Sequence, residues 1–517
     1  MYNISHCINN HPVRTFAVIT LVVCVAHLSS LSLSPICWQD EGYILEAGRV
    51  FLDRSTTWSI TLTQDNQIRK PSIFWLGPAS MEVAFKVLPP KLRGHRLWAL
   101  ICHALLCLGM LKWLLLRKHC AWVAFLCSLL VLFDPRMIQS VRGARVDVMA
   151  IALTVWALVC IRSAERGRVK SLHCKYALAG GLTAAALLTW QTAIIFGLLV
   201  VAEVLTIATD EKWPWRNYLI RALAGLFCAT LVIGILTLLF YPTVTETLVR
   251  SFSGMSSGTG FQKNLSDKLL PNWSAILKTF VPWITIWGIA SSIVVDLKKC
   301  SKYILLAFLM TVFVFSLQMV YIHRLVYLLP YAVCFAATGL SVLYHKLGRK
   351  ARQLITVVLG FALLYTSALT VGARNLGSIL QKEKRSMAPP LEMMTQTIGK
   401  GPHAVFLFTD QLYIIGRSLG WRMFSFWGHG GARVFSDDVF LKEPFRDRLL
   451  TCDYVIIEEK QKTPSTIENF SNHGFALIST SKDLLPKGSL YGAYLVFKRI
   501  DALTGNALAT PFRCRVS

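Results

Sequence analysis

Long runs of apolar residues, separated by short polar segments, recur along the first three quarters of the chain. Many approach the roughly 20 residues that an α-helix needs to cross a bilayer, and together they predict about eleven spans. The expected spans lie near residues 16–33, 97–116, 120–134, 146–162, two within 176–208, 218–241, 280–296, 303–321, 326–344 and 354–373. A break at residues 189–191 should separate the two helices within 176–208. We therefore predict a polytopic α-helical membrane protein.

The last quarter of the chain has a different pattern. Short β-branched or aromatic runs, each followed by polar or turn-rich sequence, are typical of strands. These runs lie near residues 404–409, 454–458, 475–479 and 493–498. Candidate helices between them predict a small α/β domain. We place a transmembrane domain at residues 1–375, with a first external loop at 35–95, and the α/β domain at 376–517.

Charge orients the predicted spans. The sequence is 54% hydrophobic and only 16% charged, whereas soluble domains usually carry about 25% charged residues. The formal net charge is +26, and much of the excess lies in short segments between apolar runs. The positive-inside rule assigns such segments to the cytoplasm. They contain Arg117, Lys118, Arg162, Arg166, Arg168, Lys170, Lys175, Lys298, Lys299, Lys302, Lys346, Arg349, Lys350 and Arg352.

This orientation puts the first external loop and the C-terminal domain on the extracytoplasmic side. A net charge of this size in a soluble chain would suggest a nucleic-acid partner. No basic segment here has interleaved aromatic residues, so no nucleic-acid partner is predicted.

An acidic pair, Asp40-Glu41, follows the first span directly. Trp38 and Tyr43 flank it, as expected for the membrane–water boundary. The residues at 44–52 have helical spacing and should form an interfacial helix. A solvated helix start would also favour acidic residues, because they suit a helix N-terminus. The pair therefore has a functional and a purely structural interpretation.

Cations follow at two further places. Lys70-Pro71 should open a second interfacial helix, since proline fits the first helical turn. An exposed lysine contacting lipid phosphates would look the same. Arg142 and Arg145 precede Asp147 at the outer mouth of the fourth span. Asp147 should lie within reach of Arg145, either in a catalytic cavity or in a structural salt bridge.

His323 and Arg324 lie in the tight external turn before the tenth span. No Cys/His spacing typical of a metal site accompanies them, so no metal is predicted. All these groups share one membrane face. A carboxylate there could act as general base on an acceptor hydroxyl, and cations could stabilise a departing phosphate. The set suits transfer from a lipid-phosphate donor, with the spans holding the lipid tail.

These motifs, in this order, resemble those of the GT-C glycosyltransferases, and in particular the aminoarabinose transferase and protein O-mannosyltransferase-like enzymes. The resemblance covers roughly residues 10–375. It is carried by the acidic pair after the first span, the Lys-Pro helix start, the Arg-x-Asp entry to the fourth span and Tyr-Leu-Leu-Pro in a late span. The last of these is Tyr327-Leu328-Leu329-Pro330.

The resemblance implies an inverting membrane glycosyltransferase that uses a polyprenyl-phosphate sugar donor. Its acceptor would be a glycan, lipid or protein, and its location would be a bacterial inner membrane. By the family pattern Asp40 is the base candidate, with Glu41 beside it. Lys70 would bind the donor phosphate, and Asp147 with Arg145 would line the cavity. Arg142 and Arg324 are further candidates for phosphate binding.

The sequence departs from the family pattern at two places. An acidic residue often precedes the Lys-Pro pair and a second proline follows it, but Arg69 and Ser72 occupy these positions. In some relatives that acid helps to hold a metal, so the departure speaks against a required metal. A Thr-Lys-Pro-like turn is replaced by Thr189-Trp190-Gln191, which removes a cation and could change donor or acceptor preference.

Two other functions fit a polytopic chain. A transporter or flippase of a lipid-linked sugar should show broken helices at the bilayer midplane and repeat symmetry between its halves. This sequence shows no repeat and gathers its charges at one surface. A scaffold that binds envelope components through its C-terminal domain would leave the acidic pair unexplained.

Overall fold

The computed structural model describes residues 8, 10–33, 39–52, 74–89, 92–165, 172–210, 214–240, 302–317, 322–346, 348–425, 446, 449–480, 485 and 489–500. The chain divides into two compact units. The helical unit comprises Met1–Ser29, Lys70–Leu88 and Gly94–Asn375. The sheet unit comprises Ser30–Arg69, Pro89–Arg93 and Leu376–Ser517.

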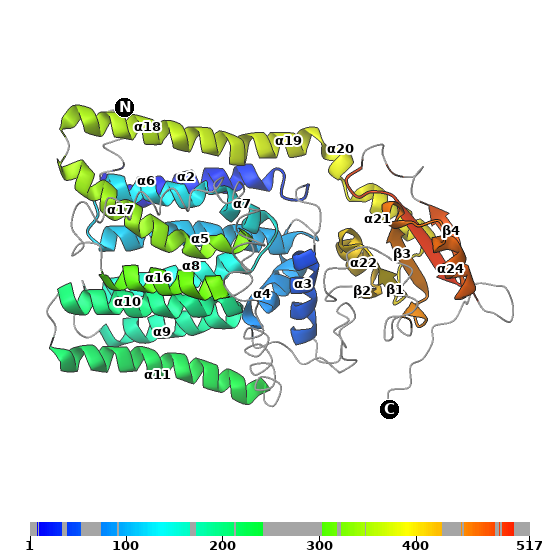
Figure 1. Cartoon of the computed structure of the whole chain (residues 1–517), viewed down its shortest axis with the longest axis horizontal. Coiled ribbons are helices and arrows are strands. Elements are labelled where there is room, and N and C mark those ends of the chain that lie inside the picture. Colours follow the sequence, from blue (N-terminus) through cyan, green and yellow to red (C-terminus); the bar gives the residue numbers. More distant parts are fainter. Residues whose placement is uncertain are drawn as a thin grey trace. The chain divides into compact units, whose positions relative to one another are not determined.

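The helical unit is a bundle of long helices that run alongside one another (Figure 1). Its described helices are α2 (Pro12–Leu28), α4 (Leu76–Val87), α5 (Gly94–Leu116), α6 (Ala121–Leu132), α7 (Pro135–Arg142), α8 (Asp147–Glu165), α9 (Leu172–Thr189), α10 (Ile195–Asp210), α11 (Trp215–Phe240), α16 (Lys302–Leu317), α17 (Leu329–Lys346) and α18 (Arg349–Ser367). Two short 3-10 helices, η2 (Gln191–Ile194) and η4 (Ile322–Leu328), precede α10 and α17. The π-helical turn η5 (Ala368–Ala373) and α19 (Arg374–Leu380) follow α18.

The prediction of a polytopic membrane protein is confirmed. Among the described residues, five helices are long and apolar enough to span a bilayer, and the bent pair α6 and α7 makes a sixth candidate. Three shorter apolar helices, at Pro12–Leu28, Leu219–Ile235 and Lys302–Val314, add to them. The predicted span at 280–296 lies outside the described residues, so the count of eleven stays a prediction.

Local sequence explains where several helices break. The predicted interruption at 189–191 is confirmed, since α9 ends at Thr189 and η2 begins at Gln191. Asp134 caps α7 by accepting hydrogen bonds from the backbone N–H groups of Arg136 and Met137. Pro135 occupies the first turn of α7, where its missing N–H costs no hydrogen bond. These signals turn the chain by 50° after α6.

Helix α8 lies at the centre of the bundle and packs against α5, α9 and α10. Helix α9 approaches α11 through small residues. A Cβ added to Gly180 would lie only 2.0 Å from the carbonyl oxygen of Gly225. Membrane helices often use glycine in this way to bring their backbones together.

The sheet unit contains a five-stranded mixed sheet with the strand order β2-β1-β3-β5-β4. The strands are β1 (Ala404–Leu407), β2 (Arg422–Ser425), β3 (Tyr454–Glu458), β4 (Phe475–Thr480) and β5 (Tyr494–Arg499). Strand β1 runs parallel to β2 and β3, whereas β5 runs antiparallel to β3 and β4. The four strands predicted from the sequence are confirmed, and β2 is the one that the prediction missed.

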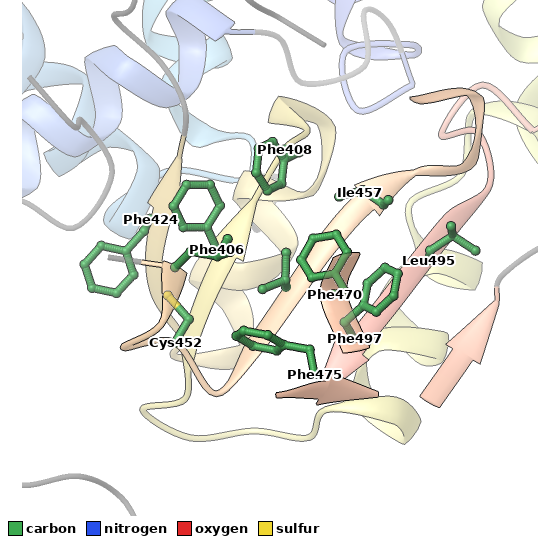
Figure 2. Packing of buried hydrophobic residues seen from close by; sticks show 11 residues of the cluster. Phe406, Phe408, Phe424, Cys452, Ile457, Phe470, Phe475, Leu495 and Phe497 are labelled. Carbon is green, nitrogen blue, oxygen red and sulfur yellow. The ribbon is translucent and has the colours of Figure 1, made fainter. Parts of the chain in front are cut away.

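Helices accompany the strands as predicted for an α/β domain. They are α20 (Lys382–Arg385), α21 (Ala388–Thr397), α22 (Tyr413–Leu419) and α24 (Thr466–Asn472). Gly420 ends α22 with a positive φ of 80°, a conformation that favours glycine, and β2 follows. Aromatic residues fill the core on one side of the sheet (Figure 2). Phe470 stacks on Phe497 with ring centroids 4.2 Å apart. Helix α3 (Gln39–Leu52), from the first predicted external loop, also belongs to this unit.

Candidate active site

Asp147 is fully buried at the first turn of α8. Arg145 donates from Nε to Asp147 Oδ2 at 2.6 Å, as the sequence predicted. Tyr327, on η4, donates its hydroxyl to Asp147 Oδ1 at 2.6 Å. Both carboxylate oxygens are therefore engaged, and the helix N-terminus adds a favourable field for the negative charge.

The turn that presents Arg145 is strained. Ala144 has a φ of 51°, which is uncommon for a residue other than glycine. Ala144 is buried between α7 and α8. Such strained backbone persists where the surroundings enforce it, and it clusters at functional sites.

A second buried polar group lies at the end of α7. Arg142 donates from Nη1 to Asn375 Oδ1 at 2.7 Å and to His27 Nδ1 at 3.1 Å. The three residues come from α7, α19 and α2, so the arginine joins segments far apart in the sequence. Its side chain is fully buried.

Several other elements of the helical unit meet at the start of α8. A Cβ on Gly77, at the start of α4, would lie 2.6 Å from the carbonyl oxygen of Thr189 and 2.9 Å from Val146. Phe196, just after the break before α10, stacks on Tyr327 with centroids 5.4 Å apart. The broken α9–α10 segment, the start of α4 and η4 thus surround the Asp147 group, and the half-buried Arg324 lies on η4 as well.

The acidic pair lies in the sheet unit, at the first turn of α3. Asp40 is half-buried, whereas Glu41 is fully buried. Arg93 Nη1 lies 3.6 Å from Glu41 Oε1. Arg93 is itself buried and donates from Nη2 to the Tyr491 hydroxyl at 3.4 Å. Helix α3 therefore begins at Gln39, before the stretch at 44–52 that the sequence predicted as helical, and Glu41 is buried in an ion pair and not solvated.

A second carboxylate fixes α3 within the sheet unit. Glu46 accepts a hydrogen bond from the Tyr413 hydroxyl at 3.0 Å and one from Arg49 Nε at 3.0 Å. Arg417 lies 3.9 Å from the same carboxylate and donates to the Tyr413 hydroxyl at 2.8 Å. This fully buried glutamate links α3 to α22. Sequence reasoning did not single it out.

The predicted site residues thus divide between the two units. Asp147, Arg145, Arg142 and Arg324 belong to the helical unit, where Arg145 and Asp147 form one cluster with Tyr327. Asp40 and Glu41 belong to the sheet unit. Lys70 lies outside the described residues. Their assignment to one active site stays a prediction.

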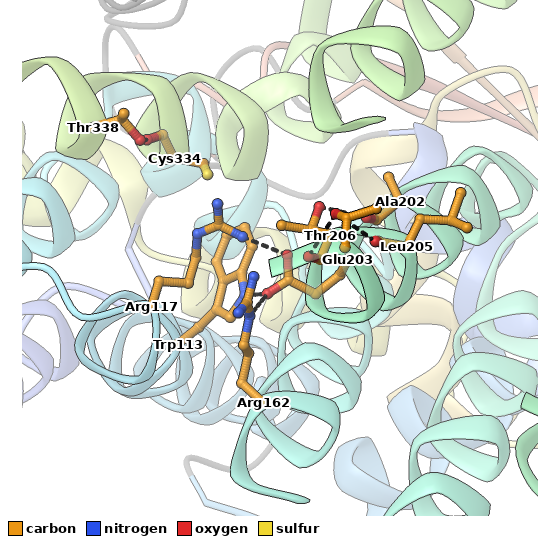
Figure 3. A network of polar contacts seen from close by, with 10 residues as sticks. Trp113, Arg117, Arg162, Ala202, Glu203, Leu205, Thr206, Cys334 and Thr338 are labelled. Carbon is orange, nitrogen blue, oxygen red and sulfur yellow. Dashed lines mark hydrogen bonds and ion pairs between the residues drawn. The ribbon is translucent and has the colours of Figure 1, made fainter. Parts of the chain in front are cut away.

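A further buried carboxylate, Glu203 of α10, was also missed (Figure 3). Trp113 donates its indole N–H to Glu203 Oε1 at 3.0 Å, and Arg117 donates to Oε2 at 2.5 Å. Arg162 donates to Oε1 as well. The sequence signal was one acidic residue in an otherwise apolar run, with Arg117 and Arg162 interpreted only as basic loop residues.

His119 lies beside this cluster, in the loop between α5 and α6. It shares a hydrogen bond with the Ser341 hydroxyl at 3.0 Å. Burial, together with Arg117 and Arg162, lowers the pKa of His119 to about 3. The imidazole is therefore neutral at physiological pH and adds no charge to the basic segment.

Among the residues that the structure describes, no group of three or more His, Cys, Asp or Glu side chains is placed to hold a metal ion.

Comparisons with known proteins relate the chain to solved structures, whereas no protein-family model and no curated protein matches it. The crystal structure of ArnT from Cupriavidus metallidurans bound to undecaprenyl phosphate is similar with a TM-score of 0.61 and 12% identity, over 96% of this chain and 99% of that one. For ArnT in the apo state the values are 0.57 and 14%, over 94% and 97%.

An oligosaccharyltransferase from Archaeoglobus fulgidus, solved in complex with Zn and sulfate, is also similar. Its TM-score is 0.50 and its identity 13%, over 88% of this chain and 69% of that one. At such identities the similarity concerns the fold. Over nearly its whole length, the chain therefore has the fold seen in ArnT.

Proposed function

We propose that this protein is a membrane glycosyltransferase that transfers a sugar from a polyprenyl-phosphate donor to an acceptor hydroxyl. The similarity to ArnT over almost the full length of both chains carries this proposal. That ArnT structure holds undecaprenyl phosphate, which is a polyprenyl phosphate. The acceptor would be a glycan, lipid or protein on the extracytoplasmic face of a bacterial inner membrane.

The Asp147 cluster supports a donor-binding role for the helical unit. Arg142 lies on α7, Arg145 in the turn before α8, and Arg324 on η4, and α7, α8 and η4 pack together. A phosphate at this end of the bundle could accept charge-assisted hydrogen bonds from arginine, the side chain best suited to phosphate geometry. The apolar helices beside it would hold the polyprenyl chain. Lys70 would be a further phosphate partner.

The chemistry would be a single displacement. Asp40 accepts the proton of the acceptor hydroxyl as the oxygen attacks the anomeric carbon. The bond between that carbon and the phosphate oxygen breaks, and polyprenyl phosphate leaves with the electron pair. One displacement inverts the anomeric configuration. Cations stabilise the charge on the departing phosphate.

Asp40 and Glu41 have different environments, which favours different roles for them. Glu41 already forms an ion pair with Arg93, so its charge is balanced within the protein. Asp40 is the more exposed of the two. We assign the base to Asp40 and a positioning role to Glu41, because a general base must reach the proton that it removes.

Substitution of Asp40 by Asn tests the assignment. The full-length chain, reconstituted in liposomes with a panel of polyprenyl-phosphate sugars and candidate acceptors, should release polyprenyl phosphate and form a new glycoside, both measured by mass spectrometry. The variant should lose at least about 100-fold in turnover, the range for a lost general base. Glu392→Gln, an exposed carboxylate change on α21, is the matched control. Full turnover by Asp40→Asn would refute the base assignment.

A transporter or flippase of a lipid-linked sugar is the second candidate. The break between α9 and α10 favours it, because transporters bind substrates at interrupted helices. The same liposomes separate the two functions. Movement of the labelled lipid-linked sugar between leaflets, with no glycoside formed in the presence of any acceptor, would support transport instead.

A further inference from the structure

A shallow groove lies between α6, α17 and α18 of the helical unit. Apolar and aromatic side chains form most of its walls. Those that define it are Trp122 and Leu126 on α6, Leu343 and Tyr344 on α17, and Ile355 and Leu359 on α18.

Arg352 also lines this groove and carries a positive charge. Its guanidinium carbon lies 4.9 Å from the centroid of the Tyr344 ring, within cation–π range. Its hydrogen bond to the carbonyl oxygen of His345 is long, at 3.5 Å. The arginine is half-buried, and long basic side chains in such positions can pack their aliphatic part on apolar neighbours.

The surroundings of the groove are strongly basic. Lys346, Arg349 and Lys350 accompany Arg352 in the sequence, and no Asp or Glu occurs anywhere between residues 331 and 382. The α6 segment at 121–132 has no acidic residue either. An anion in the groove would thus meet positive charge, with no carboxylate on the segments that line it.

The groove also opens beside a surface suited to lipid. On α18, Leu354, Val358 and Phe361 are exposed, with Phe361 at 68%. Ile355 and Leu359, on the neighbouring face of the same helix, are only half-exposed and line the groove. The outer surface of α18 beside the groove therefore offers apolar side chains to an acyl chain.

The groove is remote from the Asp147 cluster. Helix α17 has 18 residues and begins directly after η4, which carries Tyr327. At a rise of roughly 1.5 Å per residue it is about 27 Å long, close to the roughly 30 Å of a hydrocarbon core. Arg352 follows its far end. The groove and Asp147 thus lie near opposite surfaces of a bilayer.

We propose that this groove binds an anionic glycerophospholipid, with its phosphate on Arg352 and one acyl chain between α6 and α18. Basic pockets between membrane helices on the cytoplasmic side are well suited to anionic lipid head groups. The positive-inside rule makes this the cytoplasmic leaflet. The site is independent of the proposed sugar transfer and occupies the other end of the bundle.

Native mass spectrometry of the full-length chain, titrated with phosphatidylglycerol and with phosphatidylcholine, tests the proposal. Phosphatidylglycerol should bind more tightly. Arg352→Gln should weaken it by about 5-fold or more, the effect expected for one basic residue at a lipid surface. Lys350→Gln is the matched control, because its side chain is exposed and does not line the groove. Equal weakening by both variants would indicate general surface attraction and overturn the proposal.

Two further measurements identify the occupant. Thr356→Trp, which fills the groove, should weaken phosphatidylglycerol as strongly as Arg352→Gln. Phosphatidylglycerol with a photoreactive acyl chain should label α18 peptides of the wild-type protein near Ile355 and Leu359. The labelling experiment uses the wild-type protein, so its result does not depend on the folding of a variant. Labelling elsewhere would refute the site. Tighter binding of polyprenyl phosphate at Arg352 would show that the groove takes the donor lipid and not a phospholipid.

Discussion

Two of the buried carboxylates of the helical unit, Glu203 and Asp147, have surroundings that differ in kind. Glu203 is bonded by Trp113 and Arg117, at the end of α5, and by Arg162 of α8. Its interactions therefore tie three long helices together. Asp147 takes its hydrogen bonds from Arg145, two residues away, and from a neutral phenol on the short helix η4.

The difference separates a structural carboxylate from a candidate functional one. Two arginines balance Glu203 within the bundle, and removal of the glutamate would leave their charges inside the protein. Around Asp147 the partners come from a strained turn and a 3-10 helix, next to a helix break. Elements of this kind can move or exchange hydrogen bonds with a ligand more readily than packed spans.

Glu203→Ala should give the largest loss of stability. Breaking a buried ion pair from one side costs about 3–5 kcal/mol. We expect the apparent melting temperature in detergent to fall well below that of the exposed-site variant Glu392→Gln. An unchanged melting temperature would show that the arginines are solvated without Glu203, and that Glu203 is not a structural carboxylate.

Asp147→Asn should lower sugar transfer more than it lowers stability. The amide keeps the size of the side chain and can still accept from Tyr327, but it loses the charge that holds Arg145. We expect at least about 100-fold lower sugar transfer, comparable with the loss of one electrostatic contact in a transition state. The melting temperature should fall less than with Glu203→Ala, because one buried arginine loses its partner charge instead of two. A fall as large as that of Glu203→Ala would make Asp147 structural too.

The sequence predicted those parts of the fold that depend on local patterns. The break after Thr189 follows from a polar interruption in an apolar run, and the Arg145–Asp147 pair from residues two apart. Strand β2 (Arg422–Ser425) escaped prediction because four residues with polar ends give little signal. The alternation that identifies a strand needs a longer run.

Long-range polar partners could not be predicted in the same way. Glu203 lies 41 residues from Arg162 and 86 from Arg117. His27, Arg142 and Asn375 come from three distant segments. Which charged residue meets which depends on how the spans pack, and that packing is set by many weak apolar contacts. A single sequence shows only that these groups are costly to bury alone.

Tyr327→Phe tests the Asp147 cluster by changing one of its two hydrogen-bond donors. It removes the hydrogen bond to Asp147 but keeps the ring that stacks on Phe196. A hydrogen bond to a charged group is worth about 1.5–3 kcal/mol. We expect transfer to fall by roughly 10-fold or more, and by less when the same change is made in Asp147→Asn, because a hydrogen bond to the neutral amide is weaker than one to the carboxylate. Additive losses would show that the two residues act separately.

The smallest effect is expected in the sheet unit. There Glu46 links α3 to α22, as Glu203 links helices of the bundle. Tyr413→Phe removes one hydrogen bond to Glu46 and leaves Arg49 in place. The net cost should be about 1–3 kcal/mol, felt locally. Hydrogen exchange should become faster in α3 and stay unchanged in β3 and β5. Because α3 begins with Asp40 and Glu41, a looser α3 should also slow transfer slightly. Equal exchange in α3 of both proteins would show that Glu46 holds the helix through its arginines alone.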